Sequence, residues 1–275
     1  MIFLGLGLGV FFHKRFGSDW RLYAVGAATF VGSQVLHIPF NAFVLSPALG
    51  GMGFSLSDAE PPALLVIAAA FGLSAGIFEE TARLLVYRLW LKQARSWRLA
   101  LMFGAGHGGA EAIITGAITL ITVIQIIALR GTDLNAVLPA EQLELARAQI
   151  EAFWALPWYA VLLGAFERAV ALSFHLSAAV LVLQVYKRRS LMWYGLAVGW
   201  HTLLNAAAVF ASQRWGLYAT EGILVFFALG SIWIVFALRE EGIRDENPPP
   251  PPQPPPLRLS QIELSREALE ESRYD

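Results

Sequence analysis

Two short stretches place acid–base side chains inside long apolar segments. Between Arg98 and Arg130 the ionisable residues are His107 and Glu111, four positions apart in Gly-His-Gly-Gly-Ala-Glu. Residues four apart share one face of a helix, so this pair suits metal binding or a carboxylate that orients an imidazole. A charge at the centre of a bilayer costs roughly 2.5–3.5 kcal/mol, which makes the pair a candidate functional site.

The second stretch carries two adjacent glutamates and one arginine. Arg83 follows Glu79 by four positions and Glu80 by three, so on a helix it can neutralise one of the two carboxylates. Adjacent helical residues point about 100° apart, which predicts that one carboxylate is structural and the other faces a cavity. The spacing leaves open which of the two activates water.

Two later apolar stretches carry further histidines. His175 stands alone in the first, and His201 precedes Asn205 by one helical turn in the second. An amide beside an imidazole can donate hydrogen bonds to a developing oxyanion. We therefore treat His175, His201 and Asn205 as candidate site residues.

Composition indicates that lipid surrounds most of the chain. Hydrophobic residues make up 56% and charged residues 15% of the 275 residues, and the mean hydropathy is +0.55. Such a chain cannot assemble the surface of a soluble globule, so we expect a multi-pass protein of a bacterial cell membrane. We expect the lipid bilayer, and no nucleic acid, as a partner. The lack of cysteine excludes a thiolate nucleophile and a cysteine-bound metal.

The apolar segments predict an all-α bundle of transmembrane helices. A spanning helix needs about 20 mostly apolar residues. The first candidate is too short to cross about 30 Å, so we expect it to be tilted in a thinned bilayer or to begin further upstream. Seven candidate spans result, at 1–12, 21–45, 62–91, 98–129, 157–186, 191–212 and 216–238.

Basic residues predict the orientation of this bundle. Lys and Arg gather in the alternate loops 13–21, 92–98 and 187–189, which the positive-inside rule places in the cytoplasm. The N-terminus is then outside and the C-terminus inside. No cleavable signal peptide is expected, because no basic region precedes the first apolar run.

The chain divides into a membrane domain and a tail. Residues 1–238 form the helical domain, which includes an amphipathic surface helix at about 139–154. Residues 239–275 are rich in proline and acidic side chains, which is typical of a disordered cytoplasmic segment. We expect this tail to serve as a spacer that docks a partner.

The candidate site residues lie at similar depths. Counting back from the nearest cytoplasmic basic residue places Glu80, His107, His175 and His201 about 14–18 Å from the cytoplasmic end of their spans. Four helices thus contribute acid–base or metal-binding groups to one layer. We predict that these four side chains share one cavity.

These elements, in this order, resemble one known family. Phe-Glu-Glu-Thr-Ala-Arg, Gly-His-Gly-Gly-Ala-Glu, a single histidine on the next span and His-Thr-Leu-Leu-Asn are similar to motifs of the YhfC family of intramembrane metalloproteases. That family resembles the wider group of CAAX-processing and bacteriocin-processing membrane proteases. The resemblance covers most of residues 20–238.

The resemblance implies a protease that hydrolyses a peptide bond in or near the bilayer. Glu80 or Glu79 would act as the general base, in a cavity open to the cytoplasm. Two residues separate Glu80 from Arg83, where the wider group has three. The catalytic set implied by the matching elements is Glu79, Glu80, Arg83, His107, His201 and Asn205.

Two versions of the mechanism stay open. In the metal version, His107, His175 and His201, with Glu111 as a further ligand, hold zinc or a similar ion that lowers the pKa of the water. In the metal-free version, His201 and Asn205 stabilise the oxyanion and His107 orients the water. The substrate in both is a membrane-embedded or membrane-associated peptide.

Two other classes of protein could also bury such a layer. A non-catalytic scaffold could use it to receive the helices of a partner, and the proline-rich tail would suit docking. A proton- or ion-coupled transporter would need a polar pathway to both surfaces, for which the outer halves of the spans look too apolar.

Other polar residues inside the spans have structural explanations. Glu167 and Arg168 are adjacent, which favours a structural ion pair over a catalytic role. Glu221 lies near the start of its span and is expected at the interface. Gln34 and His37 are expected to form an interhelical hydrogen bond.

Overall fold

The computed structural model describes residues 1–55, 59–92 and 95–239, which belong to one compact unit. Within these ranges every regular element is a helix. The elements are α1 (Ile2–Phe16), α2 (Trp20–Phe40), the π-helix η1 (Asn41–Leu45), α3 (Ser46–Gly51), α4 (Pro61–Leu89), α5 (Trp97–Ala128), α6 (Leu134–Val137), α7 (Ala140–Ala155), α8 (Ala160–Lys187), α9 (Met192–Arg214) and α10 (Leu217–Ala237).

Six of the described helical segments are long and apolar enough to cross a membrane. One is the continuous segment Trp20–Gly51, which joins α2, η1 and α3, and the others fall on α4, α5, α8, α9 and α10. The expected all-α fold is confirmed. The 15 residues of α1 make about 22 Å of helix, which is less than the roughly 30 Å of a bilayer core. The predicted count of seven spans is therefore not confirmed, and the orientation stays a prediction.

Capping residues explain where the spans begin. Asp19 accepts a hydrogen bond from the backbone N–H of Arg21 at the start of α2, and Ser96 accepts one from Leu99 at the start of α5. Pro61 opens α4, where its missing N–H would have had no helical partner. These local signals fix the starts of α2, α4 and α5, two of which carry predicted site residues.

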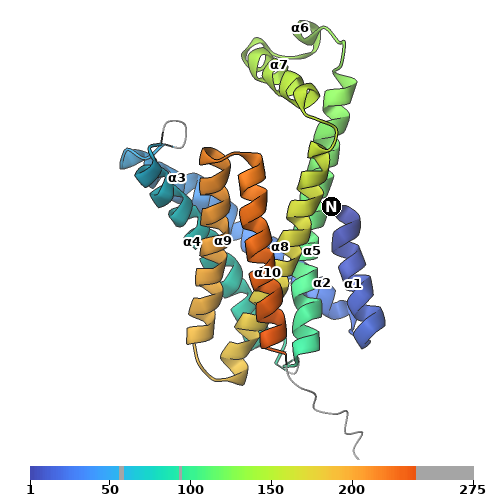
Figure 1. Cartoon of the computed structure of the whole chain (residues 1–275), viewed down its shortest axis with the longest axis vertical. Coiled ribbons are helices and arrows are strands. Elements are labelled where there is room, and N and C mark those ends of the chain that lie inside the picture. The colour runs from blue at the N-terminus through green and yellow to red at the C-terminus, as the bar shows by residue number, and fades with distance from the viewer. Residues whose placement is uncertain (56–58, 93–94, 240–275) are drawn as a thin grey trace, which may run out of the picture. The chain divides into compact units, whose positions relative to one another are not determined.

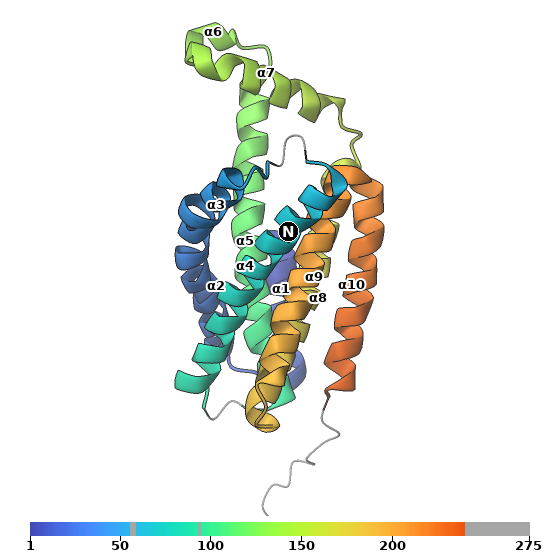
Figure 2. The same cartoon turned by 90° about the vertical axis from the view of Figure 1, so that its left-hand side faces the viewer.

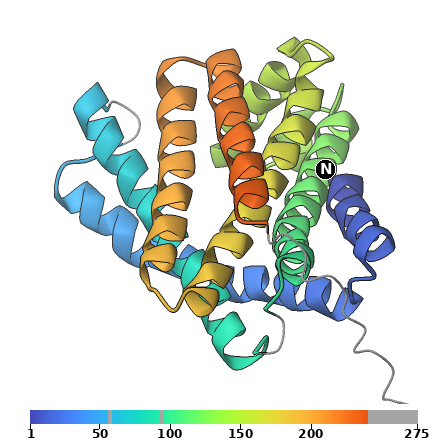
Figure 3. The same cartoon turned by 60° about the horizontal axis from the view of Figure 1, so that its bottom comes forward.

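Helix α8 lies at the centre of the bundle. It packs against α5, α9 and α10, and also touches α4. Helix α9 packs on α4 and stands beside α10, as Figure 3 shows, while α1 and α2 pack on α5. Helix α8 therefore contacts each of the other three helices that carry the predicted histidines and glutamates, α4, α5 and α9.

Glycines set the spacing between α5 and its neighbours. A Cβ atom on Gly106 would lie 2.0 Å from the carbonyl oxygen of Tyr23, and one on Gly26 would lie 2.1 Å from that of Phe103. Only a residue without a side chain fits such a backbone-to-backbone contact. The glycine-rich stretch of α5 thus allows the backbone of α2 to approach it closely.

The segment between α5 and α8 stands beyond the ends of its neighbours. Figures 1 and 2 show α6 and α7 at the far end of α5, away from α9 and α10. Helix α7 occupies the residues expected for an amphipathic helix and contains no buried residue. Its position along a membrane surface stays a prediction. The proline-rich tail lies outside the described residues, apart from its first residue, Arg239.

Candidate active site

Residues from four helices converge in the middle of the bundle. Glu79 and Glu80 come from α4, His107 from α5, His175 from α8 and His201 from α9. Each of the five residues is more than nine-tenths buried. The ring centres of His107 and His175 are 5.1 Å apart, and those of His175 and His201 are 6.4 Å apart. The predicted layer is therefore present, but the cavity beside it is lined by His175 and His201 and not by Glu80 or His107, so the prediction of one shared cavity is not confirmed for all four.

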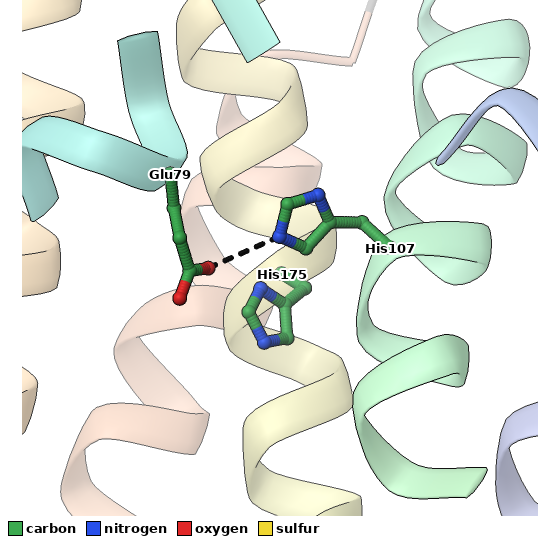
Figure 4. Close-up of side chains that lie close together, drawn as sticks. All are labelled: Glu79, His107 and His175. Atoms are coloured by element: carbon green, nitrogen blue, oxygen red, sulfur yellow. Dashed lines mark hydrogen bonds and ion pairs between the residues drawn. The ribbon is translucent and has the colours of Figure 1, made fainter. Parts of the chain in front are cut away.

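Glu79 is the glutamate of the pair that faces the cavity. Its Oε2 atom accepts a hydrogen bond from Nε2 of His107 at 3.0 Å, as Figure 4 shows. Its Oε1 atom accepts one from the side-chain amide of Gln34 at 3.1 Å. The guanidinium of Arg83 is further away, with Nη2 at 3.6 Å from Oε2. Glu79 thus lies on the cavity wall with its direction set from α2 and α5.

Glu80 is the glutamate that Arg83 neutralises. The two side chains are fully buried and form an ion pair between Oε1 and Nη1. The same Oε1 atom accepts a hydrogen bond from Nδ1 of His201 at 2.8 Å. Its Oε2 atom has no hydrogen-bond partner among the described residues. The structure thus places the two glutamates in different environments, because Glu80 holds Arg83 and His201 inside the packed protein.

A chain of hydrogen bonds continues from this ion pair through His175 and Glu111 to Arg168. Nη2 of Arg83 donates to Nδ1 of His175 at 2.6 Å, so the Nε2 atom of that ring carries the proton. That Nε2 atom donates to Glu111 at 2.5 Å. The other oxygen of Glu111 accepts from Arg168 at 2.5 Å. Glu111 therefore lies between a histidine and an arginine.

Three of the converging residues could hold a metal ion. Glu79, His107 and His175 each offer a ligand atom, and these atoms lie within 4.8 Å of one another. The three side chains, from α4, α5 and α8, are close together in Figure 4. The group includes two of the four predicted ligands and adds Glu79. The other two, Glu111 and His201, instead contact His175 and Glu80, and their role as ligands stays a prediction.

The chemistry of these donors fits a zinc ion. Two imidazoles and one carboxylate form a ligand set that catalytic zinc sites use. Nδ1 of His107 is buried without a hydrogen-bond partner among the described residues, so this ring still has one nitrogen that could contact an ion. Glu111 on Nε2 of His175 is the kind of carboxylate that orients a metal-binding histidine through its second nitrogen. For His175 to bind a metal ion through Nδ1, the contact between Arg83 and that nitrogen would have to break.

A cavity of about 350 Å³ adjoins the cluster. Its wall includes Glu79, His175, His201 and Asn205, and it continues along α9 to Ser212. That direction leads away from the basic loops and towards the end of the bundle that carries α7. The expected opening at the cytoplasmic end therefore differs from the cavity that the structure contains.

The sequence interpretation missed two groups around the site. Arg168 was expected to pair with its neighbour Glu167, but its close partner is Glu111, and Glu167 lies 4.0 Å away. Gln34 forms the expected interhelical hydrogen bond, but the sequence did not show that its partner is Glu79. His37 continues this line by contacting the amide oxygen of Gln34 at 3.2 Å. No local spacing signals the contacts of Arg168 with Glu111 and of Gln34 with Glu79, because each joins residues from different helices.

The fold and the site together define a class of protein. Six membrane-spanning helices enclose a polar cluster of glutamates, histidines and an arginine beside a cavity, which is the arrangement of a multi-pass membrane protein with a buried functional centre. The YhfC intramembrane metalloprotease family matches residues 1–228. The chain belongs to this family.

One curated relative is similar over most of the chain. It is the "Uncharacterized membrane protein YhfC" of Bacillus subtilis (strain 168), which is 31% identical over 245 residues, 86% of this chain and 92% of the relative. Its description as a bacterial membrane protein agrees with the expected location. No solved structure matches the chain.

Proposed function

We propose that the protein is an intramembrane protease that hydrolyses a peptide bond of a membrane-embedded segment. The observation that carries the proposal is the position of Glu79, which is buried, lies on the cavity wall and bonds to His107 within reach of His175. A carboxylate on a cavity wall, with the imidazole of His175 on the same wall and that of His107 behind it, can bind a water molecule and accept its proton.

Glu79 is the group that accepts the proton. Hydrogen bonds from Gln34 and His107 hold its two oxygens, so the carboxylate keeps one orientation. The bond from Nε2 of His107 also places an imidazole beside the attacking water. A general base of this kind contributes about 10²–10⁴ to the rate.

Two residues of α9 on the cavity wall, His201 and Asn205, are also given roles in the reaction. Asn205 lies on the cavity wall, where its amide N–H groups can donate to the oxyanion. His201 lies one turn earlier, and its bond to Glu80 fixes the ring. Glu80 and Arg83 are positioning residues, because the cavity wall includes neither of them.

A metal ion would use the same residues but would replace the contact of Arg83 with His175 and, if His107 binds through Nε2, its hydrogen bond to Glu79. Glu79, His107 and His175 would hold it, and when bound it would act as a Lewis acid on the water or the carbonyl oxygen. Glu111 would orient His175 through the opposite ring nitrogen.

The test compares cleavage products in cells. A bacterial host expresses the wild-type chain or Glu79→Gln at equal levels, and mass spectrometry maps new peptide termini in its membrane proteins. We expect termini that appear with the wild type and are lost with the variant. Glu144→Gln, an exposed position on α7, is the matched control and should keep them. Termini that persist with Glu79→Gln, or none with the wild type, would favour a scaffold.

Elemental analysis of the purified protein separates the two versions of the mechanism. With a metal, the wild type and His201→Ala should bind it near stoichiometrically, while His107→Ala and His175→Ala should lose it. Loss in His201→Ala with retention in His175→Ala would contradict the proposed ligands. A folded wild-type protein without metal that still yields Glu79-dependent termini would support the metal-free version.

A further inference from the structure

Three arginines gather around two aromatic rings at the end of the bundle that carries the basic loops. The guanidiniums of Arg15 and Arg98 lie 5.7 and 5.6 Å from the centre of the Phe16 ring. The guanidinium of Arg239 lies 5.6 Å from the ring of Trp97, which packs edge-on against Phe16 at 6.1 Å. A guanidinium that lies over a ring still has N–H donors for a ligand. Three positive charges, from α1, α5 and the end of α10, are thus presented together.

Arg15 and Arg98 have no carboxylate partner among the residues that the structure describes, and both are exposed. Asp19, which lies between α1 and α2, pairs with Arg21 instead. The third arginine precedes the acidic residues 240–241, which lie outside the described ranges. The charges of Arg15 and Arg98 are therefore available to an anionic ligand.

An apolar groove begins beside these arginines. One cavity, of about 270 Å³, has Arg15 and Arg239 in its wall and continues over apolar side chains of α1, α5, α8 and α10. A second cavity, of about 400 Å³, lies between α1 and α8 and reaches Phe3 near the start of α1. The two cavities share three wall residues and together form one groove, the α1 groove: Phe11, Ser173 and Leu176.

The α1 groove has about the depth of one leaflet and opens outward. From Arg15 back to Phe3, α1 rises by about 18 Å, and one leaflet is half of a hydrocarbon core of about 30 Å. Helix α1 packs on α5 at the edge of the bundle and has few contacts with α8 (Figure 1). Phe3 and Phe11 on the groove wall are 89% and 55% exposed, so lipid can reach the groove from the side.

We propose that the α1 groove binds an anionic phospholipid, with its phosphate at Arg15 and Arg98 and one acyl chain along α1. A guanidinium can meet a phosphate through two parallel hydrogen bonds. Basic pockets between transmembrane helices recognise anionic headgroups in this way. None of the described residues that line the groove lines the cavity beside Glu79, so the lipid site is separate from the proposed active site.

The test measures lipid binding to the full-length protein in neutral detergent by native mass spectrometry. The probes are phosphatidylglycerol and phosphatidylcholine with identical acyl chains, added at equal concentrations. We expect phosphatidylglycerol to bind at least about tenfold more tightly, because each arginine near an anionic headgroup contributes a factor of about five. The double variant Arg15→Gln and Arg98→Gln should lose most of this preference. Arg21→Gln, at an exposed arginine that pairs with Asp19, is the matched control and should keep it.

A further variant tests the apolar part of the site. Gly7 lies on the groove wall, and a Cβ atom there would meet no other atom within 4 Å. Gly7→Phe should therefore fill the groove without disturbing the packing of α1. We expect it to weaken binding of both lipids at least about fivefold, because each methylene removed from an apolar wall costs a factor of about four. Gly222→Phe, at an equally open glycine on α10, is the matched control and should bind both lipids as the wild type does.

Equal binding of the two lipids by the wild type would overturn the lipid site and favour an acidic protein segment as the partner of the arginines. A preference that survives the double variant would also contradict the proposal, as would unchanged lipid binding in Gly7→Phe. A large excess of inorganic phosphate should not displace the lipid. Displacement by phosphate would show that the arginines bind an anion without help from the groove, and the assignment to a lipid would then be wrong.

Discussion

Glu79 and Glu80 are adjacent in the chain, yet they lie in two different regions of the molecule. Glu79 faces a cavity and accepts hydrogen bonds from Gln34 and His107 at 3.1 and 3.0 Å, with the guanidinium of Arg83 further away. Glu80 faces packed protein, where it is fully buried against Arg83 and His201. The environments differ because neighbouring helical residues point about 100° apart.

Burial alone therefore does not show which of the two glutamates takes part in the reaction. Both carboxylates are more than nine-tenths buried, but only Glu79 lies on the cavity wall. Glu80 is already paired with Arg83, so a substitution of Glu80 should change the stability of the fold more than the activity. The removal of Glu79 should affect activity first. Four substitutions test this comparison.

Arg83→Met should give the largest effect, on the packed side. It leaves Glu80 buried without a counter-charge, and breaking a buried pair costs about 3–5 kcal/mol. The free energy of unfolding, measured by denaturant titration in detergent, should fall by that amount. The double variant Glu80→Met and Arg83→Met should recover most of the loss. If Arg83→Met keeps its stability, Glu80 and Arg83 do not form the structural pair.

Asn205→Ala should act on the cavity side with little effect on folding. Removing one donor to an oxyanion lowers kcat by about 10²–10³. Rates are measured on a peptide identified by terminus mapping, together with the melting temperature. Asn135→Ala, an exposed amide on α6, is the control. A loss of melting temperature without a fall in kcat would assign Asn205 to the packed side.

Glu111→Gln should have an intermediate effect, if a metal is bound. A carboxylate that orients a metal-binding histidine contributes about 10–100-fold to affinity when present. Competition with a chelator of known affinity measures the change. His13→Gln, outside the cavity, is the control. Complete loss of metal would make Glu111 a ligand, as the sequence suggested.

Glu144→Gln should give the smallest effect, because it touches neither region. The residue is exposed on α7, and surface substitutions of this kind change stability by about 0.5 kcal/mol or less. Unfolding free energy and cleavage should both match the wild type. A clear loss of cleavage with normal stability would show that α7 takes part in substrate selection.

Long apolar runs made the helices predictable, and loop charges made the depth of the site predictable. Each span was expected within a few residues of its observed ends, apart from the second, where Pro39 precedes the π-helical turn η1. Counting from the basic loops placed Glu80, His107 and His175 in one layer because straight helices rise by a constant amount per residue.

The partners within that layer could not be predicted from the sequence. Local spacing on α4 allows Arg83 to meet either glutamate, and the side chains that α8 and α9 place beside them, His175 and His201, decide between the two. The contact of Arg168 with Glu111 joins residues 57 positions apart, so the adjacent Glu167 seemed the better partner. Tertiary packing decided both cases.

The glycine contacts between α2 and α5 have a consequence for how the site assembles. Gly26 and Gly106 let the two backbones touch, and Gly108 leaves room for the ring of His175, which a Cβ atom would approach to 2.7 Å. The position of His107 is thus set by the contact between the two backbones. The site therefore forms only when these helices pack against each other during insertion. Adding a single methyl group at Gly106 should stall that step and send the chain to quality-control proteolysis, although every chemical group of the site would still be present.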